Sequence, residues 1–111
     1  MNVTDFNKLT TEILDKVKNT LIKKQDEYNL DTDRLAFFKK ASVLKDEYPH
    51  QTLLGYTNKQ IVSEFDMGMS GKDFSEDLWI EKIIDIICYQ VLFYAVLKDT
   101  EMFTKKVTNK K

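Results

Sequence analysis

The chain has 111 residues, of which 42% are hydrophobic and 32% are charged. These fractions are typical of a folded soluble protein, and the length is enough for one domain with its own core. Lys and Arg (17) nearly balance Asp and Glu (18), so the net charge of −1 gives no reason to expect a nucleic acid or an anionic membrane as a partner. A single Cys excludes an internal disulfide and the N-terminus lacks a secretory signal, so we expect a cytoplasmic protein.

Three stretches in the first 69 residues carry apolar side chains at helical spacing. They predict helices over 4–28, over 34–45, and from about 50 to 67 or 69, with Pro49 marking the start of the third. On a helical wheel Asp66 borders the apolar face of the third helix, which predicts a position at the edge of the core, whereas Glu64 should lie in water. The apolar face that we expect to be buried is Leu54, Ile61, Val62, Phe65 and Met69.

The fourth predicted helix, residues 75–98, is apolar almost all round. Asp73 and Glu76 have the spacing of a capping box at its start. A helix of this kind is buried in a core or spans a membrane, and each central charge would cost about 2.5–3.5 kcal/mol to insert into a bilayer. We therefore expect a buried C-terminal helix and no membrane span. Its polar residues form one narrow stripe with Gln90 as the outlier: Glu81, Lys82, Asp85 and Tyr89.

No segment shows convincing strand alternation, so the sequence predicts an all-α fold, a four-helix bundle. The domain should cover residues 1–98, followed by a polar, basic tail over 99–111. The lysines of this tail either contact phosphates or only keep the chain soluble.

Two carboxylates on one face of the fourth helix are the strongest chemical signal. Glu81 and Asp85 are four residues apart and can share a divalent cation such as Mg²⁺. The alternative is a pair of solvated or Lys-paired acids at the mouth of the bundle. Asp66 on the preceding helix, with Lys59 and Ser63 on its face, would complete a site suited to a triphosphate.

Other chemistry-bearing residues have simple structural interpretations. Cys88 lacks a second cysteine and should be a buried, inert thiol, and His50 is the only histidine, which excludes a histidine metal cluster. Tyr28, Tyr56 and Tyr89 either stack on a base or fill gaps between helices.

The segment 24–98 resembles a family of small phage-encoded helical proteins, which are similar to the MazG-like all-α nucleoside triphosphate pyrophosphohydrolases. The most specific match is the pattern K-x-x-x-S-x-x-D at 59–66 followed by E-K-x-x-D-x-x-x-Y at 81–89. The resemblance implies a Mg²⁺ site at which water splits a triphosphate into a monophosphate and pyrophosphate. The chain departs from the related phage proteins at Phe37, Gln60 and Cys88, where they tend to have Asn, His and Asn. The implied metal ligands are Asp66, Glu81 and Asp85, and the implied substrate-binding residues are Lys59, Ser63 and Tyr89.

Three functions follow from these observations, the last of them nucleic-acid binding through the lysines of the C-terminal tail. The first is a Mg²⁺-dependent nucleotide hydrolase, or a nucleotide binder on the same scaffold. The second is a non-catalytic helical protein that docks on a host or phage protein, for which the seven Phe, five Tyr and one Trp could supply an interface. The first two hypotheses both allow a homo-oligomer.

Overall fold

The computed structural model describes residues 1–27 and 33–103. They form four helices and no strand: α1 (Val3–Glu27), α2 (Ala36–Leu44), α3 (Pro49–Met69) and α4 (Glu76–Asp99). The predicted all-α class is confirmed, and each helix end lies within two residues of its predicted position. None of the described helices is long and apolar enough to cross a membrane.

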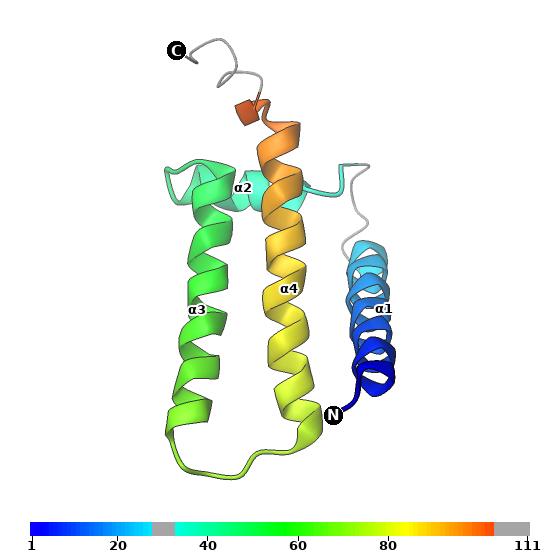
Figure 1. Ribbon diagram of the computed structural model, residues 1–111. Helices are drawn as coiled ribbons and strands as arrows, with labels where there is room; N and C mark the ends of the chain where they lie inside the picture. Colours follow the sequence, from blue (N-terminus) through cyan, green and yellow to red (C-terminus); the bar gives the residue numbers. More distant parts are fainter. Residues whose placement is uncertain (28–32, 104–111) are drawn as a thin grey trace, which may run out of the picture.

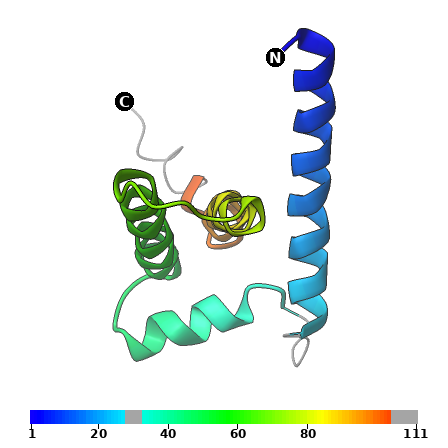
Figure 2. The same ribbon diagram turned by 90° about the horizontal axis from the view of Figure 1, so that it is seen from below.

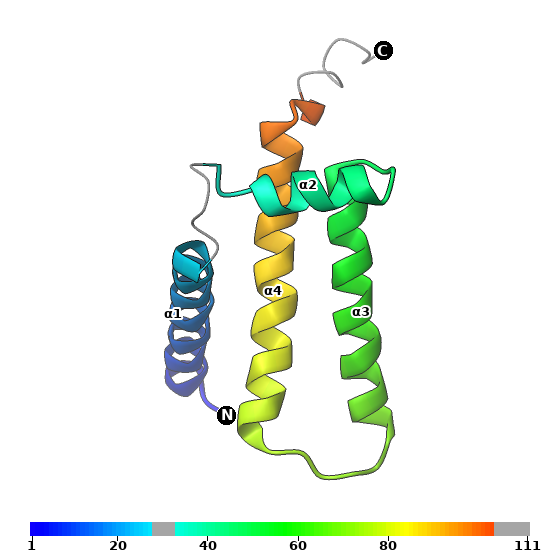
Figure 3. The same cartoon turned by 180° about the vertical axis from the view of Figure 1, so that it is seen from behind.

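α4 is the central helix of the arrangement. α3 runs antiparallel beside it, and α2 lies across the end where α3 begins and α4 finishes (Figures 1 and 3). α1 packs against the other side of α4. It crosses α4 obliquely: in Figure 2, α3 and α4 are seen end-on, whereas α1 is seen along its length. A bundle of the MazG-like type stays a prediction.

Local hydrogen bonds explain where three of the helices begin. Asn2 Oδ1 accepts from the Asp5 N–H at 2.8 Å ahead of α1, and Gln51 Oε1 accepts from the Tyr48 N–H at 2.8 Å where Pro49 opens α3. At α4, Ser75 Oγ accepts from the Leu78 N–H at 3.1 Å. The expected capping box starting at Asp73 was therefore wrong, because the extended residue directly before the helix is Ser75.

The core consists of two clusters that share α4. One lies where α2, α3 and α4 meet, and the other lies where α1 meets α4, with the partly buried Leu21 packed against both. The Cys88 thiol, buried as expected, points at the Val17 carbonyl oxygen, with Sγ 3.8 Å from it. The first cluster is Leu35, Phe38, Leu53, Leu92 and Val96; the second is Val17, Ile84 and Cys88.

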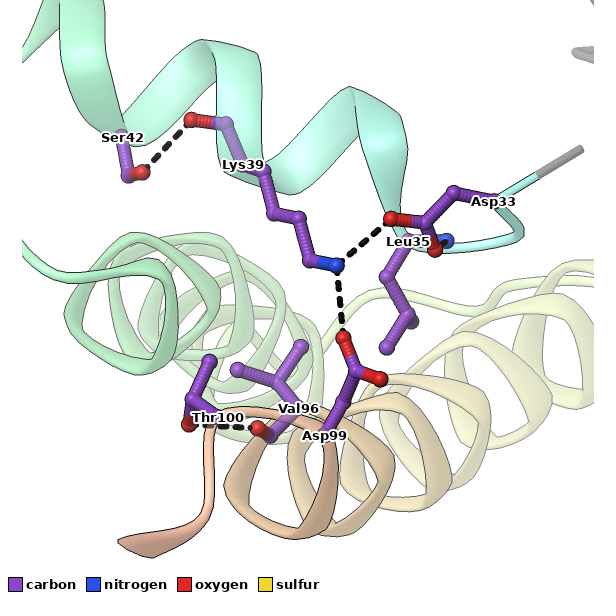
Figure 4. A network of polar contacts seen from close by, with 7 residues as sticks. All are labelled: Asp33, Leu35, Lys39, Ser42, Val96, Asp99 and Thr100. Carbon is purple, nitrogen blue, oxygen red and sulfur yellow. Dashed lines mark hydrogen bonds and ion pairs between the residues drawn. The ribbon is translucent and has the colours of Figure 1, made fainter. Parts of the chain in front are cut away.

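Ion pairs join α2 to the C-terminal end of α4 (Figure 4). Lys39 Nζ lies 2.5 Å from Asp33 Oδ2 and 2.6 Å from Asp99 Oδ2. Asp33 Oδ1 also accepts from the Leu35 N–H at 2.9 Å. The hydrogen bond from Lys39 lowers the pKa of the Asp33 carboxyl, and those to Asp33 and Asp99 raise the pKa of the Lys39 ammonium.

α4 is only partly buried. Its buried residues recur every four positions from Ile84 to Val96; Ile84 and Cys88 pack against α1, and Leu92 and Val96 pack against α2 and α3. Between 37% and 57% of Leu78, Ile83, Val91 and Tyr94 is exposed, so the helix is less buried than the sequence predicted.

The orientation of α3 differs from the prediction. The five apolar residues expected in the core, Leu54, Ile61, Val62, Phe65 and Met69, are all exposed. The buried face instead carries Thr52, Leu53, Thr57 and Met67, because Leu53 packs against α2 and α4 and fixes the rotation of the helix. The apolar stripe was identified correctly, but it faces outward.

Candidate functional site

Two residues of the polar stripe of α4, Lys82 and Tyr89, contact α3. Lys82, Asp85 and Tyr89 are partly buried, and Glu81 is exposed near the start of the helix. Lys82 Nζ donates to Gln60 Oε1 of α3 at 3.0 Å and so ties the two helices together. This residue row therefore borders the contact between α3 and α4 rather than bulk solvent alone.

The facing side of α3 is also polar. Gln60, Ser63 and Glu64 are partly buried, while the apolar stripe of the same helix is exposed. The prediction that Asp66 borders the core and that Glu64 lies in water was wrong, since Asp66 is exposed and Glu64 is partly buried. The two acids lie about 160° apart on the helical wheel, so the rotation of α3 that buries one exposes the other.

Three acids lie at the same end of the α3–α4 pair. On α3 the spacing Leu53, Thr57, Gln60, Glu64 makes one row, and on α4 the spacing Glu81, Asp85, Cys88, Leu92 makes another. Leu53 packs with Leu92 and the helices are antiparallel, so Glu64 lies level with the start of α4, whereas Cys88 of the second row packs on Val17 of α1. Trp79 lies next to Gly68, 3.9 Å from where a Cβ would stand, which agrees with this register. We name the end that carries Glu64, Glu81 and Asp85 the acidic end.

Within residues 1–27 and 33–103, no ion pair within 4.0 Å involves a carboxylate of the acidic end. Across the described residues, both ion pairs within 4.0 Å are made by Lys39, which lies at the opposite end of α4. The acids are also not a ready-made metal cage, since residues 1–27 and 33–103 contain no group of three or more His, Cys, Asp or Glu side chains that could hold a metal ion. The site predicted from Asp66, Glu81 and Asp85 thus stays a prediction.

The predicted substrate-binding residues are dispersed around α3 and α4. Lys59 is exposed on the outward side of α3, near Asp66 on the wheel, and Ser63 is partly buried. Tyr89 stacks on Tyr56 with ring centroids 6.2 Å apart, and Lys45 Nζ lies 4.9 Å from the centroid of the Tyr56 ring. This packing matches the gap-filling alternative for Tyr56 and Tyr89. Tyr28 and most of the basic tail, 104–111, lie outside the described residues.

Sequence reasoning missed Glu64 as a candidate. Its row with Leu53, Thr57 and Gln60 contains only one apolar residue, so a hydrophobic pattern gives no reason to turn it inward. The available signal was the polarity of Thr57, Gln60 and Glu64 at four- and three-residue spacing, opposite the acids of α4.

Comparison of the chain with known protein families, with curated proteins and with solved structures found no match. The resemblance to MazG-like proteins therefore remains an expectation from the sequence.

Proposed function

We propose that the acidic end binds Mg²⁺ together with a nucleoside triphosphate. The observation that carries the proposal is the inverted polarity of α3, which turns Gln60, Ser63 and Glu64 toward α4 and leaves its apolar stripe in water. Partly burying these polar groups costs free energy, which the packing of Leu53 on α2 and α4 offsets. Residues that break such a rule are commonly kept for a site.

The chemistry of the donor set suits this ligand. Mg²⁺ is commonly held by one or two carboxylates plus substrate phosphates and water, and does not need a cage of protein side chains. Asp85 and Glu81 would supply the carboxylates, Glu64 of α3 lies at the same end of the helix pair, and Lys82 would supply a positive charge for a phosphate. Bound Mg²⁺ would polarise a phosphoryl oxygen and activate water for hydrolysis to a monophosphate and pyrophosphate. Asp66 lies on the other flank of α3, so within one chain the proposal rests on the acidic end.

Calorimetry tests the proposal directly. Each of the four deoxynucleoside triphosphates is titrated into the protein with and without Mg²⁺, and heat is expected only when Mg²⁺ is present. At a nucleotide concentration of about 100 times Kd, binding to the native state adds about 2.7 kcal/mol to the free energy of unfolding. We expect the melting temperature to rise by about 10 °C.

A double variant locates the binding site. E81Q/D85N is expected to abolish the heat and the melting shift, because two of the three carboxylates become neutral amides. The matched control is E12Q/D15N, which makes the same two exchanges on the exposed side of α1. No heat with any nucleotide, or equal heat from E81Q/D85N, would contradict the proposal.

A second candidate function is that of a cytoplasmic interaction protein that binds a host protein. The exposed apolar residues of α1, α3 and α4 favour it. This function predicts that the biological effect survives E81Q/D85N and is lost when exposed aromatic residues are changed. Either function is compatible with self-association of the chain.

A further inference from the structure

α3 carries a continuous apolar surface on the side away from α4. We name Leu54, Ile61, Val62, Phe65 and Met69 the outer face; between 41% and 71% of each residue is exposed. At 100° per residue they fall within about 100° of the helix circumference. A stripe of that width normally packs against another surface.

The exposed area of the chain leaves room for such a contact. Its accessible surface is 8655 Å², whereas a monomer of 13.1 kDa is expected to expose about 6,400 Å². A standard interface needs only about 800 Å² from each partner.

The charges beside the outer face are self-complementary. Lys59 and Asp66 lie along one edge of it, seven residues apart, with about 20° between them on the wheel. When two copies of α3 pack antiparallel about a two-fold axis, the same edge of each helix meets, and Lys59 of one copy faces Asp66 of the partner subunit twice. The net charge of −1 for each chain adds little repulsion.

Gly55 fits the same register. It lies in the interior of α3 beside the outer face, and nothing is within 4 Å of where a Cβ would stand. Gly in a helix interior costs about 1 kcal/mol relative to Ala, and the monomer shows no contact that requires it. The register that pairs Lys59 with Asp66 of the partner subunit also places Gly55 level with Ser70 of the partner subunit, just past the end of its α3, where the missing side chain makes room.

We propose that the outer face of α3 is a homodimer interface, in which α3 packs antiparallel against α3 of a second copy. The proposal assigns Lys59 and Asp66 to subunit pairing. It does not rest on nucleotide binding, since the acidic end lies on the opposite side of α3.

Equilibrium sedimentation of the full chain tests the proposed interface. The protein is expected to sediment at twice the 13.1 kDa of one chain. Phe65→Glu should raise the dimer dissociation constant by at least about thirtyfold, because each dimer would bury two charges at its centre. The matched control is Phe6→Glu, which makes the same exchange at a similarly exposed position of α1 and should leave the constant unchanged. Circular dichroism is the control for folding, and both variants are expected to keep the helix content of the wild type.

Charge reversal tests the antiparallel register. Lys59→Asp and Asp66→Lys, each alone, should raise the dissociation constant by about tenfold, since two favourable pairs become repulsive. The double variant K59D/D66K should return to the wild-type value, and mixing the two single variants should form heterodimers. A monomer at all concentrations, a dimer unaffected by Phe65→Glu, or a double variant as weak as the single ones would overturn the proposal.

Discussion

Lys39 makes both ion pairs found among the described residues, and their role is structural. Its ammonium bridges Asp33, before α2, and Asp99, at the end of α4. More than a third of each of these three side chains is exposed, so water and salt screen the ion pairs. We therefore expect a modest contribution that fastens α2 across the end of the α3–α4 pair.

Lys39→Met should lower the free energy of unfolding by no more than about 1 kcal/mol at pH 7. The pKa of Asp33 is lowered on folding, so its stabilising effect is present above the unfolded pKa and is lost as the pH falls through the folded value. The pKa of Lys39 is raised, so its effect is lost only as the pH climbs through the folded value. The difference between wild type and variant should thus be constant from about pH 5 to pH 9 and shrink outside that window.

Urea denaturation at several pH values measures this difference. Lys40→Met is the matched control, because Lys40 is the exposed neighbour of Lys39 in the same helix. A difference that grows below pH 4, or that equals the Lys40→Met effect at pH 7, would contradict the role given to Lys39.

The sequence predicted the environment of some residues correctly and of others incorrectly. The sequence identified Glu81 and Asp85 as acids on one helix face, since that depends only on their spacing. It assigned Asp66 and Glu64 to the wrong environments, because that assignment depends on how α3 is rotated. The rotation is set by Leu53 packing against Leu35, Phe38, Leu92 and Val96, which are distant in sequence.

Individual helices were predicted accurately because their ends are encoded locally. Pro49 opens α3, and Ser75 opens α4 by accepting the Leu78 N–H. The orientation of α3 was not encoded in this way. An apolar stripe indicates only that a face will be covered, and a pattern within one chain cannot distinguish a core from a subunit interface.

Ser75→Ala should lower the free energy of unfolding by about 1 kcal/mol, because the Leu78 N–H at the start of α4 would lose its partner. Ser75→Asp should retain most of the wild-type stability, since a carboxylate also caps a helix and favours its N-terminal dipole. Urea denaturation of the three proteins is the measurement. No loss from Ser75→Ala would show that the cap contributes nothing at this position.

The whole molecule is open for its size. α1 contacts α4 but crosses it obliquely, and apolar residues of α1 such as Phe6 and Leu14 remain exposed. The sequence predicted the helix count, but not how few faces of α4 a single chain would cover. A chain that leaves this much apolar surface in water is expected to draw stability from association.

The melting temperature should therefore depend on protein concentration. For an unfolding dimer, a tenfold rise in concentration should raise it by about 3–5 °C. Phe65→Glu should melt at the same temperature at every concentration, and Phe6→Glu should behave as wild type. A wild-type melting temperature that does not change with concentration would contradict a link between association and folding.

The apolar outer face of α3 and the polar side that faces α4 point in opposite directions. A subunit or host protein that covers the outer face approaches from the side away from Glu64, Glu81 and Asp85. A small ligand at those acids and a protein on the outer face are therefore expected to bind simultaneously, without competing for the same atoms.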